Sequence, residues 1–135
     1  MKRKLAHIGI AVPKLADAVP VFEIILGKGP DCYEEVTEQK VKTAIFGTGE
    51  SRVELLEGTA DDSPISKYIA KKGSGIHHLC IQVEDLEAEL RRLKEAGLRL
   101  IDEVPRKGAE GMLVAFIHPK STAGILVELN QQPNE

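Results

Sequence analysis

Two histidines and two glutamates recur at matching places in this 135-residue chain and could together hold a metal ion. Each half of the sequence opens with a strand-like segment that carries a histidine and closes with one that carries a glutamate: His7, Glu54, His78 and Glu128. Imidazole nitrogens and carboxylate oxygens suit divalent ions such as Co²⁺, Mn²⁺, Ni²⁺, Fe²⁺ or Zn²⁺. Four such ligands would leave two of about six octahedral positions open for a bidentate substrate.

An internal repeat supports this set of ligands. Superposing His7 on His78 aligns the apolar residues that alternate along both segments: Ile8 with Leu79, Ile10 with Ile81, Val12 with Val83 and Leu15 with Leu86. Further along, residues 52–55 resemble residues 126–129, which places Glu54 on Glu128. Because equivalent inward positions of two such copies converge, the repeat predicts one shared site.

The elements that would position these residues follow a βαβββ order in each copy. Alternating residues predict strands over 5–12 and 77–83. Helices are expected over 14–26, closed by Gly27, and over 85–96, capped by Asp85 and followed by Gly97. The remaining expected strands cover residues 31–37, 40–47, 52–57, 99–104, 112–118 and 124–129. Pro20 should kink the first helix or delay its start.

These elements predict an α+β fold, with two tandem βαβββ modules forming a curved mixed sheet around one metal site. A single domain is expected over residues 1–135, with module one at about 5–58 and module two at about 75–130. A short helix over about 62–73 should link the two modules.

Composition excludes several classes of function. The net charge of −3 and the absence of a basic stripe argue against nucleic-acid binding. No apolar run is long enough to span a membrane, and the first residues do not resemble a signal peptide. We therefore expect a cytoplasmic protein without a membrane partner. Cys32 and Cys80 fit no CxxC pattern and are interpreted as packing thiols.

The other two histidines are expected to play structural parts. His77 neighbours His78 and must point to the opposite face of the strand, so we expect it to pack or to support the site. His118 is interpreted as a loop residue rather than a ligand.

The chain resembles the vicinal-oxygen-chelate (glyoxalase/bleomycin-resistance/dioxygenase) superfamily and, within it, the methylmalonyl-CoA epimerase family. The resemblance covers essentially the whole chain and is carried by residues 5–12, 62–65, 75–81, 118–120 and 124–129. It implies that His7, Glu54, His78 and Glu128 bind a divalent ion, cobalt first. It also implies an isomerase that interconverts (2R)- and (2S)-methylmalonyl-CoA and acts as a homodimer.

The implied reaction removes a proton from C2 and returns it through a metal-stabilised enolate, which requires acid/base groups on both faces. Glu128 is the first candidate, and the second proton carrier is left open between Glu54, a metal-bound water and a residue that the sequence does not place. The bacterial pattern of the family has a glutamate in the third strand, where this chain has Thr43. Lys120 and Ser121, with Thr43, are the expected substrate-binding residues, and Lys120 could receive the substrate carboxylate or a CoA phosphate.

Two other functions stay open at this point. A glyoxalase-type metalloenzyme of the same fold would share the four ligands. A non-catalytic ligand-binding module of the same fold typically lacks them, so the presence of all four candidates argues against that alternative.

Overall fold

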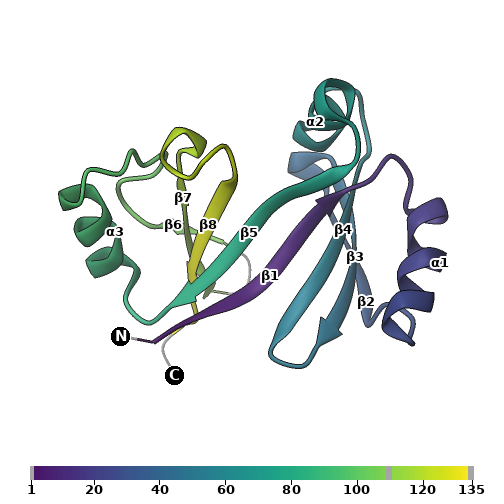
Figure 1. Cartoon of the computed structure of the whole chain (residues 1–135), viewed down its shortest axis with the longest axis horizontal. Helices are drawn as coiled ribbons and strands as arrows, with labels where there is room; N and C mark the ends of the chain where they lie inside the picture. The colour runs from purple at the N-terminus through teal and green to yellow at the C-terminus, as the bar shows by residue number, and fades with distance from the viewer. Residues whose placement is uncertain (1, 109–110, 134–135) are drawn as a thin grey trace. The chain divides into compact units, whose positions relative to one another are not determined.

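The computed structural model describes residues 2–108 and 111–133, and the repeat predicted from the sequence is visible in it (Figure 1). The chain forms two compact units. The first unit consists of His7–His77. The second unit combines the residues up to Ala6 with those from His78 onward.

The first unit carries four strands, the first of them from His7 onward, and two helices. In chain order these are β1 (Arg3–Ala11), α1 (Leu15–Leu26), β2 (Cys32–Val36), the 3-10 turn η1 (Thr37–Gln39), β3 (Val41–Thr48), β4 (Ser51–Gly58) and α2 (Pro64–Lys72). The strands lie in the order β2-β3-β4-β1. Strand β1 is parallel to β4, and the other two pairs are antiparallel.

The second unit repeats this connection. Its elements are β5 (Gly75–Val83), α3 (Leu86–Glu95), β6 (Arg106–Lys107), β7 (Leu113–Ile117), the 3-10 turn η3 (Pro119–Ser121) and β8 (Leu126–Gln131). Its strands lie in the order β5-β8-β7-β6, with β5 parallel to β8 and the other pairs antiparallel. The predicted α+β fold of two βαβββ modules, each with a mixed sheet, is therefore confirmed.

Helix α1 packs on the first sheet through an aliphatic stripe. Leu15 and Val19 are buried against Phe46 and Leu55, as helical spacing of the apolar residues predicts. The backbone N–H of Leu15 donates to Glu57 Oε1 at 2.6 Å, which satisfies one of the free donors at the helix start. Gly27 ends the helix with a φ of 72°, as predicted.

Of the two effects expected of Pro20, a kink or a delayed start, the delayed start does not occur. Helix α1 begins at Leu15 and contains Pro20. Pro20 lacks an N–H, so the carbonyl of Ala16 loses its helical donor. Both residues are exposed, so water can take the place of that donor.

Helix α3 fits the prediction closely. The side chain of Asp85 accepts from Ala88 N at 3.1 Å, and Gly97 follows the helix with a φ of 92°. Leu86 and Leu90 are buried against apolar residues of β7 and β8. The apolar stripe that predicted the helix is thus the face of α3 that packs on the sheet.

The strand predicted over 99–104 is wrong. These residues, all of them described, form only one isolated bridge, between Leu100 and Ile117. The carboxylate of Asp102 accepts the backbone N–H of Phe116 at 2.9 Å, which occupies a donor that a full strand would need. Pro105 then follows, and β6 is reduced to Arg106–Lys107.

The linking helix predicted over 62–73 corresponds to α2, which packs on the first unit. Ser63 is buried and its hydroxyl accepts from Ile65 N at 3.1 Å, while Pro64 takes the first helical position. Ile65 packs against apolar residues of β1, β3 and β4. Among the described residues, no helix is both long and apolar enough to cross a membrane.

Glu89 on α3 is a buried charge held by two arginines of the second unit. Its carboxylate is 2% exposed and accepts from Arg3 Nη2 at 2.9 Å and from Arg92 Nε at 3.0 Å. Burial alone raises the pKa of Glu89, but hydrogen bonds and charge from Arg92 and Arg3 outweigh it, so its pKa is lowered. The ionised form therefore stabilises the folded chain.

Replacing Glu89→Gln should lower the free energy of unfolding by about 1–2 kcal/mol at pH 7. The loss stays this small because both arginines are partly exposed and water screens their attraction to Glu89. A lowered folded pKa adds stability above the unfolded pKa of about 4.3, and this contribution is lost as the pH falls. Urea unfolding at pH 7 and at about pH 3 measures both effects, because the contribution is lost as the pH falls through the lowered pKa, with exposed Glu87→Gln as the control. Equal destabilisation of the Glu89 variant at both pH values would contradict this assignment.

Candidate metal centre

The first unit places His7 beside Glu54. Strands β1 and β4 are parallel neighbours whose register pairs His7 with Arg52 and Gly9 with Glu54. Residues two apart on a strand share a face, so His7 and Glu54 point to the same side of the sheet. His7 Nδ1 lies 3.4 Å from Glu54 Oε2. The two side chains are 9% and 14% exposed, so both are largely shielded from water but keep some accessible surface.

The second unit places His78 beside Glu128 in the same way. Strands β5 and β8 are parallel neighbours whose register pairs His78 with Leu126 and Cys80 with Glu128. His78 Nε2 lies 3.6 Å from Glu128 Oε1, and these side chains are 12% and 16% exposed. The two copies thus each bring one imidazole nitrogen and one carboxylate oxygen together, which alternation and the repeat had indicated.

The spacing of each pair fits two ligands of one cation. Metal–donor distances of about 2.0–2.2 Å put adjacent donors of an octahedral ion about 3 Å apart. The observed separations of 3.4 Å and 3.6 Å need only small side-chain movements to match. The donor chemistry also fits, because nitrogen and oxygen ligands suit the divalent ions named above.

Arg52 is a functional candidate that the sequence analysis did not single out. Its guanidinium lies 3.1 Å from His7 Nδ1 and 3.3 Å from Glu54 Oε2. Arginine has no acceptor, so the imidazole nitrogen must accept from it. The signal was available: Arg52 and Glu54 are two apart on one strand and so share a face.

Local charge and burial keep His7 neutral. Burial, with the charge of Arg52 as the second cause, lowers the pKa of His7 to about 4. Burial raises the pKa of Glu54, and Arg52 opposes that rise through its charge and hydrogen bond. A neutral imidazole at pH 7 has one lone-pair nitrogen, as a ligand must, and here that nitrogen accepts from Arg52, so a metal ion would have to take the place of the guanidinium.

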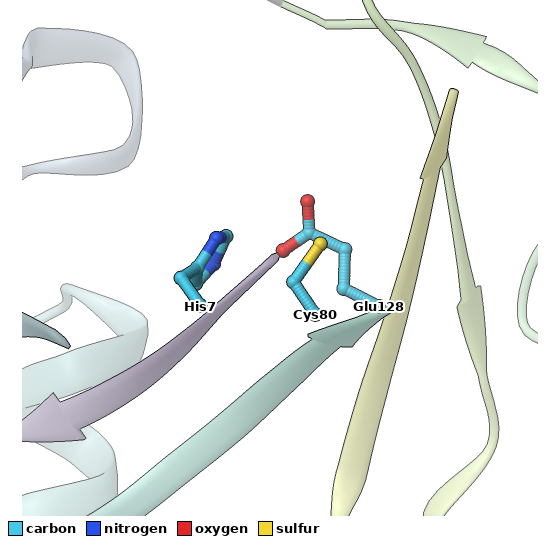
Figure 2. A group of neighbouring side chains, drawn as sticks. All are labelled: His7, Cys80 and Glu128. Carbon is cyan, nitrogen blue, oxygen red and sulfur yellow. The ribbon is translucent and has the colours of Figure 1, made fainter. Parts of the chain in front are cut away.

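The two cysteines differ in burial, and one correction is needed. Cys80 is fully buried, as expected of a packing thiol, but Cys32 is exposed on β2, so its interpretation as a packing thiol is wrong. Every residue of β2 is exposed because the strand lies at the edge of its sheet. Figure 2 shows Cys80 and Glu128 on adjacent strands, and their ligand atoms lie within 4.8 Å of one another.

The remaining histidines take structural positions. The ring of His77 meets Tyr68 edge to face, with ring centroids 5.1 Å apart, as a packing role predicts. Burial and then the charge of Lys72 lower the pKa of His77. His118 stands before η3, where its Nδ1 accepts from Lys120 N at 3.0 Å, so it shapes a loop as expected.

The expected substrate-binding residues lie in different settings. Lys120 is exposed in η3. Ser121, in the same turn, accepts from Arg99 N at 2.8 Å and so also holds the loop. Thr43 is 6% exposed on β3. The register aligns Ile45 with Glu54, so Thr43 shares the face of the first sheet that carries Glu54.

Comparison with known proteins places these residues in a family. Residues 6–116 match the family described as the Glyoxalase/Bleomycin resistance protein/Dioxygenase superfamily. An ethylmalonyl-CoA/methylmalonyl-CoA epimerase of Cereibacter sphaeroides is 38% identical over 95% of this chain and 97% of its own length. The mitochondrial methylmalonyl-CoA epimerase of Homo sapiens is 37% identical over 95% of this chain and 73% of its own.

Solved structures give the same picture. A methylmalonyl-CoA epimerase in complex with methylmalonyl-CoA and NH4+ superposes with a TM-score of 0.85 at 32% identity. The match covers 98% of this chain and 96% of that one. Similarity of sequence and of fold therefore extends over nearly the full length of both.

Proposed function

This chain belongs to the Glyoxalase/Bleomycin resistance protein/Dioxygenase superfamily, and on that premise we propose that it interconverts (2R)- and (2S)-methylmalonyl-CoA. Relatives and a solved structure with that activity in their names match nearly the whole chain. The observation that carries the proposal is the equivalent His–Glu pair in each unit, at 3.4 Å and 3.6 Å.

The proposal includes one divalent ion held by His7, Glu54, His78 and Glu128, with Co²⁺ the first choice and Mn²⁺, Ni²⁺, Fe²⁺ or Zn²⁺ as alternatives. Its support is the donor chemistry and spacing of the two pairs. When bound, the ion supplies a Lewis acid for the negative charge that the substrate oxygens gain as the C2 proton leaves.

The chain's own residues supply the other steps. Glu128 is proposed to move a proton at C2, since it lies on β8 with its carboxylate beside His78. Glu54 remains the second candidate named from the sequence. Lys120 and Ser121 are proposed to bind the carboxylate of the substrate or a phosphate of CoA. Thr43, on the same face of the first sheet as Glu54, is proposed to contact the substrate as well.

Deuterium exchange at C2 tests this function. Methylmalonyl-CoA incubated in D₂O with the protein and a panel of divalent ions should gain deuterium at C2, and the metal-stripped protein should exchange at least about 100-fold more slowly. Mass spectrometry follows the gain in mass. Metal-loaded protein without C2 exchange would refute the function. A glyoxalase-type enzyme would bind the same ions and give that negative result.

The finer expectations on assembly and location are proposed along with the function. We propose a homodimer, as the family resemblance implies, and light scattering of the purified protein tests it. The cytoplasmic location stays a prediction. Neither expectation changes the residues assigned above.

A further inference from the structure

One face of the first unit's sheet presents a short list of polar groups. Helix α1 packs on the opposite face through Leu15, Val19, Phe46 and Leu55. Register and alternation put the following side chains on the face that carries His7: Arg52, Glu54, Thr43, Cys32 and Glu34. Among the strand residues that belong to the first unit, His7–His77, these and His7 are the ones that offer polar or ionisable side chains there.

Epimerisation at C2 needs a second proton carrier besides Glu128, because the C2 proton leaves one face of the carbon and a proton must be added to the opposite face of the planar enolate. Arg52 stays protonated and cannot accept a proton. Thr43 carries only a hydroxyl, which is a poor base. Glu54 can serve only while it also acts as a metal ligand. Glu34 is the carboxylate on this face with no such second task.

Glu34 lies directly across from Thr43. The antiparallel register of β2 and β3 pairs these two residues. Directly opposed residues on one face have Cβ atoms about 4.5–5.5 Å apart, so the longer glutamate side chain can bring its carboxylate over Thr43. Its chain neighbour Glu35 pairs with Lys42 and points to the other face. A carboxylate, that of Glu34, thus lies one strand away from the position where the family pattern has its third-strand glutamate.

The edge position of β2 suits this task. Glu34 is exposed, while Thr43 beside it is buried. A carboxylate at the rim of the face can meet a bound substrate from the side and exchange its proton with water between turnovers. Of the described hydrogen bonds and ion pairs, none occupies Glu34, in contrast to Glu54 and Glu57 on β4, which lies beyond β3 in the sheet.

We propose that Glu34 is the second catalytic acid/base, in the place where the resemblance led us to expect a glutamate at Thr43; this inference rests on the proposed function. For one epimer the carboxylate of Glu34 takes the C2 proton, and the C–H electron pair moves toward the thioester oxygen. Glu128, protonated beforehand, delivers a proton to the opposite face as the electron pair returns. The reverse direction exchanges the two roles, and solvent resets both carboxyl groups.

The test separates interconversion from exchange in Glu34→Gln. We expect epimer interconversion to fall about 10²- to 10⁴-fold. C2 exchange into one epimer should persist with retention of configuration, because Glu128 still serves that face. Exchange into the other epimer should fall with interconversion. Glu34→Asp should restore part of the rate, and bound Co²⁺ should stay unchanged.

Glu35→Gln is the matched control, one residue along the strand and facing the other way. Interconversion by Glu34→Gln at the rate of this control would overturn the inference, as would equal loss of exchange into both epimers. A wild-type protein that exchanges neither epimer would instead refute the proposed function, and this inference would fall with it. The wild-type measurement therefore distinguishes the two failures.

Discussion

The His78→Ala protein is expected to bind Co²⁺ more than about 100-fold less tightly than the wild type and to lose exchange at C2 in proportion. Changes to groups that merely orient a ligand cost about 10- to 100-fold in affinity, so loss of a ligand should cost more. In this variant Glu128 loses the imidazole nitrogen that lies 3.6 Å from it. Isothermal titration with Co²⁺ measures the affinity, and elemental analysis measures the bound metal.

The control for that experiment lies one residue away. His77→Ala removes a ring that packs on Tyr68, so it should keep the Co²⁺ affinity within a few-fold of the wild type. Circular dichroism of both variants at the assay temperature excludes unfolding as the cause. An unchanged metal content in His78→Ala would defeat the ligand assignment, whatever the control does.

The Phe46→Ala protein is expected to lose about 3–5 kcal/mol of its free energy of unfolding. Phe46 is fully buried on β3, where its ring packs near that of Phe22 on α1, with centroids 6.5 Å apart. Truncation removes buried apolar surface and leaves a cavity that the surrounding strands can fill only in part. The same strand carries Thr43, so the loss should also disturb the candidate site.

Urea unfolding followed by circular dichroism measures this loss as a lower midpoint. Ile24→Ala is a suitable control because Ile24 lies on α1 with 83% of its side chain exposed, and its change should stay within about 0.5 kcal/mol. A Phe46→Ala midpoint equal to that of Ile24→Ala would show that α1 does not cover the sheet as described.

Prediction from the sequence succeeded wherever the signal was local. The stripe of Leu86 and Leu90, with Asp85 before it, contained all that α3 required. It failed where a distant group decided the outcome. Residues 99–104 have the composition of a strand, yet Asp102 takes the N–H of Phe116 from another segment. Nothing near Asp102 in the sequence announces that bond.

Burial and side-chain partners were likewise predictable only where they depend on residues close in the sequence. Cys32 looked like a packing thiol by its neighbours, but its strand lies at the edge of the sheet and stays exposed. Arg52 had no assigned role, and only the parallel pairing of β1 with β4 brings it to His7. Strand order and register depend on contacts between residues far apart in the chain, and alternation alone does not encode them.

The sequence by itself determined the two-fold repeat, because each βαβββ module shows the same pattern of alternating apolar residues followed by an apolar helical stripe. It also determined that each module offers an equivalent histidine and an equivalent glutamate on strands. Only the tertiary structure decided that His7 meets Glu54 and that His78 meets Glu128, since parallel pairing aligns strands separated by a helix and two further strands. Register likewise placed Glu34 opposite Thr43, because pairing across a sheet fixes which side chains become neighbours.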